Sequence, residues 1–522
     1  MKKYFILILY VVFISNRISA QFSPDTYRLQ TDEKSLDKIV SQNPLSNSIT
    51  DIITIGDTVW LGTSRGVSLS VDGGTNWTNF YGQADFGTDN NSALGYDYTN
   101  RVLWCAGAKS TEVKGGQSLP AGTGLKYTTN NGISWTSIPQ PLDANTDTVE
   151  QYGINQIRAL PVTVTIQNLV YDIAFTPNTI WIATFAGGLR KSTDNGLTWK
   201  RVILPPDYLN SISPTDTLNF CLSPVPGSFC SEGNLNHRVF SVIAADDTTL
   251  YVGTAGGINK STDNGISWVK LNAQNQSQPI SGNFITALGY NKSNNTVWAS
   301  TWKAENQSEF YGVSSSSDGG QNWRTFLRDE RPHNFGFKNS QVMVPTDNGV
   351  FRSSDNGLTW LLPNSIVDAE SNTELRTNVF YAADSYQNNI WLGSEDGLVK
   401  LQETFGKVWE GNWKIFFASK PLTSNNDTYC YPNPFNPRQE ELKIKYSTGG
   451  VDANVTIRIF DFAFNYVHTV VQNVFRNLDL EGTPEFWNGK DDNGNTVPNG
   501  VYFYRVDVGD NDAVYGKILV MQ

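Results

Sequence analysis

The chain has 522 residues, and 39 lysines and arginines face 50 aspartates and glutamates, which gives a formal net charge of −11. An acidic balance without a run of basic residues argues against a nucleic-acid partner, because phosphate backbones are bound mainly by lysine and arginine. Aromatic residues make up 12% of the chain, a content usual for β-rich surface proteins, and the length allows two or three domains.

The first twenty residues have the composition of a secretory signal peptide. Met1-Lys2-Lys3 is a basic start, residues 4–15 form an apolar core, and Ile18-Ser19-Ala20 is a small-residue cleavage site. We therefore predict a signal peptide over residues 1–20 and an N-terminal lead segment over residues 21–45. No other segment is long and apolar enough to predict a membrane span.

One short phrase, Ser/Thr-x-Asp/Asn-x-Gly-x-x-Trp, occurs six times between residues 70 and 360. Its acidic or amide residue and its tryptophan are Asp72 and Trp77, Asn130 and Trp135, Asp194 and Trp199, Asp263 and Trp268, Asp318 and Trp323, and Asp355 and Trp360. The hydroxyl and the carboxylate can bond to the amides of a tight turn, and the glycine tolerates a positive φ. We interpret each copy, called a box below, as a structural turn rather than a catalytic or metal site.

Short β-branched and aromatic runs precede each box. Ile180-Trp181-Ile182-Ala183-Thr184 is one example, and such runs are typical of buried strands. Four antiparallel strands per repeat, with the box between the third and the fourth, predict a propeller blade. The six boxes and a seventh unit around Ile390-Trp391-Leu392-Gly393, which has no box, predict an all-β chain with a seven-bladed β-propeller over residues 46–425.

The boxes resemble the Asp-box (BNR) repeats of sialidases and related propellers. This resemblance implies the fold and says little about function, because propellers host unrelated activities. A sialidase would have six blades and an early Arg-Ile-Pro motif, whereas this chain has seven predicted blades and lacks that motif. Xyloglucan-cleaving relatives place their cleft between two propellers, and one propeller is predicted here.

Nearly all extra length is expected on the propeller face opposite the boxes, called the loop face below. The insertions span residues 83–92, 109–123, 139–167, 205–237, 302–309 and 364–377. Loops elaborated on one face of a rigid scaffold are where binding usually resides, and aromatic rings beside carboxylates suit a sugar or a protein. The candidate ligand-face residues are Phe86, Tyr152, Tyr208, Trp302, Glu305 and Phe310.

The cysteines and histidines add little chemistry. Cys221 and Cys230 flank eight residues inside one insertion, and we expect them to form a disulfide that closes this loop in an exported protein. Cys105 and Cys430 are left either unpaired or joined to each other. Three histidines at wide spacing predict neither a metal site nor a nucleophile, and no cofactor is expected.

The last part of the chain, residues 426–522, contains short alternating strands and Asn-Gly turns that predict a small β-sandwich. Tyr431-Pro432-Asn433-Pro434, Trp487-Asn488-Gly489 and Asn499-Gly500-Val501-Tyr502 resemble the C-terminal sorting domain of type IX secretion cargo and the Ig-like domain of flagellar hook-capping proteins. Many sorting domains end on a second basic residue, whereas this chain ends Val520-Met521-Gln522. Because prolines open the segment, we expect a separate module with few contacts to the propeller.

The resemblance implies a type IX-like secretion machinery as the partner, and a secreted or outer-surface location that the chain reaches through the periplasm. We favour a non-catalytic protein that binds a glycan or a surface protein through the loop face. A glycoside hydrolase of sialidase-like or xyloglucanase-like type is the first alternative, and a structural or assembly component of the cell envelope is the second.

Overall fold

The computed structural model describes residues 40–522 except 42, 114–116, 304–308, 371–372, 376, 419–427, 432, 439–440, 449–450 and 477–483. The predicted signal peptide and most of the lead segment lie outside the described residues, as does the predicted boundary between residues 425 and 426, so these remain predictions. In the described residues, no helix combines the length and hydropathy that a membrane crossing needs.

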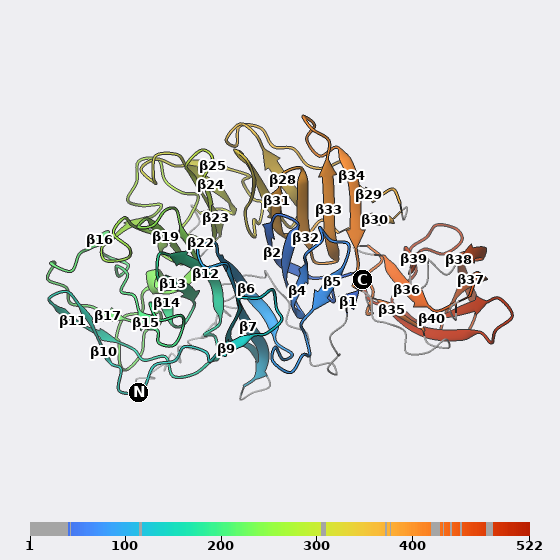
Figure 1. Ribbon diagram of the computed structural model, residues 1–522, viewed down its shortest axis with the longest axis horizontal. Coiled ribbons are helices and arrows are strands. Elements are labelled where there is room, and N and C mark those ends of the chain that lie inside the picture. The colour runs from blue at the N-terminus through green and yellow to red at the C-terminus, as the bar shows by residue number, and fades with distance from the viewer. Residues whose placement is uncertain are drawn as a thin grey trace, which may run out of the picture.

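In the described part of the propeller, seven sheets form the blades, and these blades of antiparallel strands follow one another in the chain (Figure 1). Blades one to three consist of β2 (Ile49–Ile55), β3 (Thr58–Thr63), β4 (Gly66–Ser70) and β5 (Trp77–Asn79); β6 (Asn90–Asp97), β7 (Val102–Glu112), β8 (Ser118–Thr128) and β9 (Thr136–Ile138); and β12 (Val170–Thr176), β13 (Thr179–Thr184), β14 (Gly188–Ser192) and β15 (Lys200–Arg201).

Blades four to seven continue the series. They consist of β18 (Val239–Ala244), β19 (Leu250–Thr254), β20 (Gly257–Ser261) and β21 (Trp268–Leu271); β22 (Phe284–Asn291), β23 (Thr296–Trp302), β24 (Gly312–Ser316) and β25 (Arg324–Phe326); β26 (Gly336–Lys338), β27 (Gln341–Thr346) and β28 (Gly349–Ser353); and β31 (Phe380–Tyr386), β32 (Asn389–Ser394), β33 (Gly397–Glu403) and β34 (Gly411–Phe416). The all-β propeller that the sequence predicted is confirmed.

Blade six departs from the expected four strands. Its sheet has three strands, and the segment after the box contributes a single bridge between Arg352 and Leu361. Pro363 follows two residues later and has no N–H group, so the ladder cannot continue there.

The last blade packs directly on the first and closes the ring. Oδ2 of Asp384 in β31 accepts hydrogen bonds from the backbone N–H and the hydroxyl of Thr54 in β2, at 2.7 and 2.8 Å. The Trp77 and Trp391 rings of the same two blades lie 6.1 Å apart, edge to face. A closed ring leaves only short strand edges that the neighbouring blades protect, which stabilises an antiparallel architecture.

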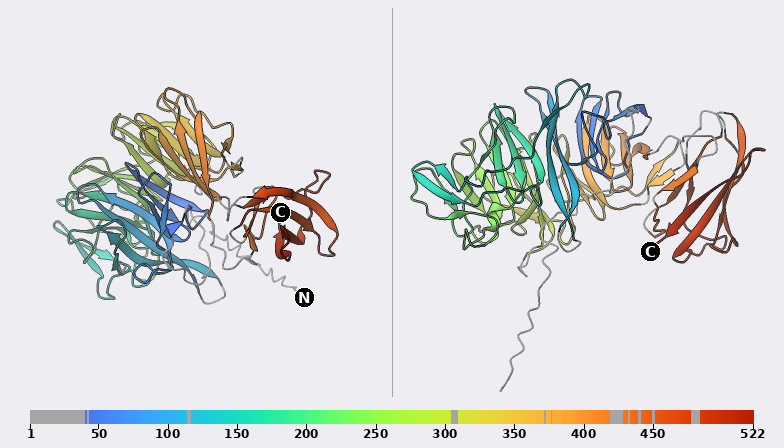
Figure 2. Two further views of the ribbon diagram at one scale, coloured as in Figure 1. Left: turned by 45° about the vertical axis from the view of Figure 1, so that its right-hand side comes forward. Right: turned by 90° about the horizontal axis from the view of Figure 1, so that it is seen from below.

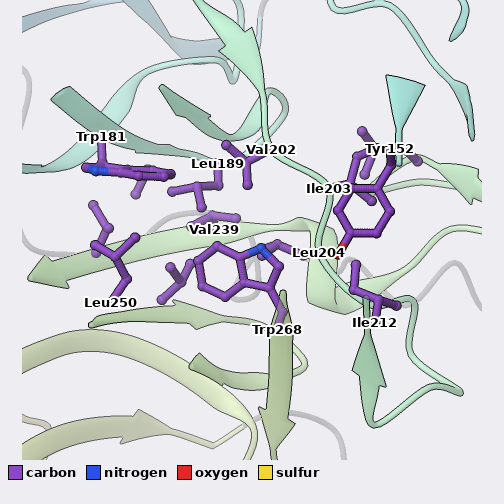
Figure 3. Close-up of a cluster of buried hydrophobic side chains, with 14 of the residues drawn as sticks. Tyr152, Trp181, Leu189, Val202, Ile203, Leu204, Ile212, Val239, Leu250 and Trp268 are labelled. Carbon is purple, nitrogen blue, oxygen red and sulfur yellow. The ribbon is translucent and has the colours of Figure 1, made fainter. Parts of the chain in front are cut away.

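Adjacent blades share hydrophobic cores. Figure 3 shows the core between blades three and four, where Trp181, Leu250 and Trp268 lie close to one another. Trp181 is 0% exposed and Trp268 1% exposed. Each large buried ring removes a large apolar area from water, and this term dominates the stability of such a core.

Three insertions, over residues 139–167, 205–237 and 364–377, form strands of their own, and the lead segment adds one more. β1 (Val40–Ser41), β16 (Ser211–Ile212) and β29 (Ile366–Asp368) pair with the outermost strands of blades one, four and seven, and β30 (Thr373–Leu375) pairs with β29. β10 (Val149–Tyr152), β11 (Asn155–Ala159) and β17 (Cys221–Leu222) join two insertions in one small sheet, and the 3-10 helix η1 (Leu235–His237) follows. The added strands cover blade edges that would otherwise expose unpaired amides.

The C-terminal segment is a two-sheet sandwich beside blade seven (Figure 2). One sheet has β35 (Thr428–Tyr431), β36 (Leu442–Tyr446) and β39 (Glu485–Trp487), and the other has β37 (Ala453–Phe460), β38 (Tyr466–Arg476), β40 (Gly500–Val508) and β41 (Val514–Val520). Tyr504, Trp487 and Ile518 belong to a buried core between the sheets. Its membership of an Ig-like class stays a prediction.

Candidate ligand-binding site

All six boxes have the same internal hydrogen bonds. In the first box, the Gly74 N–H donates to the Ser70 hydroxyl at 2.8 Å, and Oδ1 of Asp72 accepts that hydroxyl and the Asn76 N–H. The other five copies repeat these three bonds. Each of these bonds joins residues no more than four positions apart, as a structural turn requires.

The charge state of the box aspartates follows from these bonds. The hydroxyl of Thr198 and then its N–H hold the pKa of Asp194 at about 2, and Thr359 has the same effect on Asp355. A carboxylate with such a low pKa is a poor proton donor near neutral pH. The box aspartates therefore serve the turn and are unsuited to acid catalysis.

The box glycine also sets the distance between blades. A methyl group on Gly265 would lie 2.6 Å from the Trp181 ring of the preceding blade, and one on Gly74 would lie 2.5 Å from the Trp391 ring. Both glycines have positive φ. Backbone conformation and close packing thus demand glycine at the same position.

Three of the candidate ligand-face residues are core residues, so their assignment to a binding surface is wrong. Phe86 is 4% exposed and packs 4.9 Å from the Trp135 ring. Tyr152 is buried and donates its hydroxyl to the Ile266 carbonyl at 2.7 Å. Trp302 is buried and donates its indole N–H to the Pro332 carbonyl at 2.9 Å. These rings hold the insertions against the blades instead of facing solvent.

The other three candidates differ in their surroundings. Tyr208 is 60% exposed. Phe310 is half-buried, and the guanidinium carbon of Arg328 lies 4.3 Å from its ring centre. Glu305 lies outside the described residues, so the prediction for it stays open. Among the described candidates, Tyr208 alone offers an exposed ring.

The cysteines are placed as follows. Cys221 and Cys230 form a disulfide with a Cα–Cα distance of 5.8 Å, which closes the loop that follows β17. Cys105 is buried in blade two and Cys430 is half-buried in β35, and both are free thiols. Of the two alternatives that the sequence allows for Cys105 and Cys430, the structure has the unpaired one.

A cavity of about 280 Å³ lies where the innermost strands of all seven blades converge. Its lining includes Asp51 of β2, Asp172 of β12 and Asp384 of β31. Its aromatic lining residues are Tyr98, Tyr171, Phe240, His333, Phe335, Phe337 and Tyr381. The lining residues, all in the described part of the chain, include no lysine or arginine, so the cavity is acidic and aromatic.

The three aspartates hold neighbouring blades together. Oδ2 of Asp51 accepts the Leu94 N–H of blade two at 3.2 Å. Oδ2 of Asp172 accepts the Val242 N–H at 2.9 Å and the Ser241 hydroxyl at 2.7 Å, both from blade four. With the Asp384–Thr54 contact, they join three pairs of adjacent blades next to the cavity. Such carboxylates are held in place before any ligand arrives.

Burial makes these carboxylates unusually weak acids. It raises the pKa of Asp51 to about 7, and repulsion from Asp172 and then from Asp384 adds to the rise. Burial likewise raises the pKa values of Asp172 and Asp384 to about 6. The repulsion places Asp51 within electrostatic reach of both Asp172 and Asp384.

His333 also lines the cavity. Its Nε2 lies 2.7 Å from Oδ1 of Asp347, and its ring meets Trp302 and Tyr381 edge to face. The His333 side chain is 1% exposed, and its Nδ1 has no hydrogen-bond partner among the residues that the structure describes. With Nε2–H donating to the carboxylate, Nδ1 is left as an acceptor.

Asp51 and Asp172 lie toward the loop face of the propeller. The Ser64 N–H, in the turn between β3 and β4, donates to the Ser48 carbonyl just before β2, so β2 begins at this face. Asp51 and Asp172 are the third residues of β2 and β12. Neither aspartate is among the candidates that the sequence predicted, although Thr50-Asp51-Ile52 and Tyr171-Asp172-Ile173 occupy equivalent places in their repeats and an alignment of the units could have found them.

No family model matches the chain. The xyloglucanase Xgh74A of Acetivibrio thermocellus is 25% identical over 306 residues, which is 55% of this chain and 28% of that protein, so the chain spans less than a third of this curated relative. PorZ of Porphyromonas gingivalis, whose structure is described as that of a surface component of the type-IX secretion system, is 14% identical, with 91% of this chain and 66% of PorZ covered and a TM-score of 0.32. A GH74 xyloglucanase from Xanthomonas campestris is 12% identical, with 78% and 59% covered and a TM-score of 0.48.

Proposed function

We propose that this chain is a secreted or outer-surface protein that binds a glycan or a protein without transforming it, and that the ligand enters the central cavity from the loop face. The observation that carries the proposal is the cavity itself, an acidic and aromatic space surrounded by all seven blades. A preformed concave site with a few fixed polar groups is the usual form of a ligand site.

The engagement of the cavity carboxylates favours binding over catalysis. Asp51, Asp172 and Asp384 each accept at least two hydrogen bonds from the protein, and the bonds from neighbouring blades fix their positions. A nucleophile or a proton-transfer group must reach the reacting atoms of a substrate. These carboxylates hold neighbouring blades together by hydrogen bonds, and only their remaining lone pairs are available to a ligand.

Export rests on the sequence at both ends of the chain. The basic and apolar start favours passage through the inner membrane. The resemblance of residues 426–522 to sorting domains favours a type IX-like machinery as the partner that recognises the sandwich. We place the mature protein outside the cell, where a rigid propeller can present its loop face to a ligand.

A glycoside hydrolase is the second candidate, and two observations favour it. The chain shares 25% identity over 306 residues with a xyloglucanase. The raised pKa of Asp51, about 7, would suit a general acid beside other carboxylates. The cavity volume of about 280 Å³ matches a single small group better than a polysaccharide chain that lies across the surface.

One experiment separates the two candidates. Purified chain without the predicted signal peptide is applied to a glycan array and to immobilised outer-membrane extract, and it is incubated in parallel with xyloglucan in an assay for new reducing ends. We expect retention on a glycan or a surface protein and no new reducing ends. Release of reducing ends that Asp172→Asn abolishes would establish hydrolysis, and absence of retention on every surface would refute the binding function.

A further inference from the structure

We infer that the central cavity accepts a single ammonium group on an aliphatic stem, as carried by a lysine side chain of a partner protein or by a free aliphatic amine. The inference rests on the proposed binding function and names the chemistry of its ligand. It starts from the charges of the lining. Asp51, Asp172 and Asp384 face a cavity whose lining residues include no lysine or arginine. A cation placed beside Asp51 would relieve its repulsion by Asp172 and Asp384.

Two lining residues carry a buried polar atom that is unpaired among the described residues. Nδ1 of His333 has no partner, although the side chain is 1% exposed. Oγ1 of Thr50, the residue before Asp51, has none either. Both atoms have almost no accessible surface, so they are unpaired polar atoms beside the cavity and become available to a ligand only when their side chains turn toward it. An ammonium group has three N–H donors and no acceptor.

The depth of the cavity fits an extended stem. Asp51 and Asp172 are third in their strands, whereas Asp384 is fifth in β31. At the rise of a β-strand, Asp384 lies roughly 7 Å further from the loop face. Tyr171, Phe240 and Tyr381 lie in the lining with these carboxylates. Aromatic rings contact methylene groups and attract a cation over their faces, so a lysine side chain matches both parts of the site.

A metal ion matches the same lining less well. Calcium takes six to eight oxygen ligands with free lone pairs. The carboxylates here already accept hydrogen bonds from backbone amides and hydroxyls, and the described residues contain no group of three or more acidic, histidine or cysteine side chains with the geometry of a metal site. The aromatic rings of the lining cannot serve as ligands of a metal ion, whereas they can attract and contact an organic cation.

Calorimetry with matched probes tests the inference on the full mature chain. The charged probes are Nα-acetyl-lysine methyl ester and cadaverine, and the neutral probe is Nα,Nε-diacetyl-lysine methyl ester. We expect at least one charged probe to bind tenfold more tightly than the neutral probe. Asp51→Asn/Asp172→Asn should weaken that binding at least tenfold, and Asp247→Asn, an exposed carboxylate outside the cavity, should leave it unchanged. Preference for the ester indicates a protein partner, and preference for cadaverine indicates a free amine.

A tethered cation gives a second test that leaves the blade contacts intact. Thr50 lines the cavity, so Thr50→Lys should place an ammonium group there, abolish binding of the charged probe and raise the melting temperature. Thr50→Met, of similar length without charge, should not raise it. Equal binding of charged and neutral probes, no binding of either at 10 mM, or displacement of the charged probe by calcium would overturn the inference. If the chain is retained on a glycan or a protein and the cavity variants are retained equally well, the inference about the ammonium group is overturned. The proposed binding function is then still supported.

Discussion

Nζ of Lys443, in the C-terminal sandwich, lies 2.8 Å from Oδ2 of Asp396 in the turn between β32 and β33 of blade seven. The Lys443 side chain is 2% exposed, and its Nζ lies 3.9 Å from the centre of the Phe417 ring. Asn47 donates a further hydrogen bond to Asp396. The expectation of few contacts across this joint is therefore wrong, because a buried ion pair and an aromatic ring connect the two parts.

Lys443→Met should loosen the sandwich from the propeller. The substitution leaves the Asp396 carboxylate largely buried without its cation, and removing one partner of a buried pair costs about 3–5 kcal/mol. Differential scanning calorimetry should show separate unfolding transitions for the propeller and the sandwich. The parent chain should show fewer transitions, because the two parts then unfold together.

Two matched variants test this interpretation. Lys490→Met removes an exposed lysine of the same sandwich and should change nothing. Lys443→Met/Asp396→Leu removes both charges and should recover much of the lost stability, since apolar replacement of a buried pair is often neutral. If Lys443→Met melts like the parent chain, the pair does not hold the joint.

The blade pattern could be predicted because the box is local. The three side-chain hydrogen bonds that define the Ser70–Trp77 turn join residues no more than four positions apart, so each copy can form wherever its sequence occurs. The structure of the insertions depends instead on contacts between residues far apart in the sequence. The parallel pairing of Arg158 with Cys221 joins segments 63 residues apart and depends on where blades three and four place them. No local signal specifies such a contact.

The candidate site was harder to predict, because sequence gives the type of a side chain and not its burial. Trp302 and Phe86 lie at the margins of insertions, where an exposed ring and a ring that holds a loop in place have the same sequence. The cavity carboxylates are a different case. Asp51 and Asp172 repeat in register, but Asp384 lies two residues further along its strand, so only the closed ring brings the three together.

Trp268→Ala should destabilise the propeller more than Trp199→Ala does. Trp268 is 1% exposed in the core between blades three and four, whereas Trp199 is half-buried. Loss of a fully buried tryptophan costs about 3–5 kcal/mol, and the half-buried ring should cost correspondingly less. Urea unfolding measures both, with Leu197→Ala, 77% exposed in the same box as Trp199, as the control. Equal losses for the two tryptophans would contradict the role of burial.

Asp51→Asn should become more stable than the parent chain as the pH rises. The folded pKa of Asp51 is about 7 against an ordinary value of 3.8, so the folded state favours the protonated acid. That contribution is complete below pH 3.8 and is lost as the pH rises through 7. The variant has no charge to bury, so its relative stability at pH 8 should exceed that at pH 4.5 by on the order of 2–4 kcal/mol.

The difference between variant and parent is the measurement, because burial lowers the pKa of His237 to about 4 and its contribution runs in the opposite direction over part of this range. Asp194→Asn is the matched control. The pKa of Asp194 is about 2, so its contribution is lost as the pH falls through 2 and its effect should be constant between pH 5 and 8. A constant difference for Asp51→Asn over the same range would show that its carboxyl is not buried as the structure places it.

The last prediction concerns export. By the resemblance to sorting domains, deletion of residues 426–522 should leave a folded propeller in the periplasm, because the Asp384–Thr54 contact closes the ring without the sandwich. Deletion also exposes Phe417 and Asp396, so a failure of export could reflect aggregation alone. Lys443→Met separates these causes, since it loosens the sandwich and keeps it on the chain. We expect fractionation to find Lys443→Met outside the cell and the soluble truncated chain in the periplasm. If the truncated chain reaches the medium in normal amount, the sandwich has no role in export and serves only to cover blade seven.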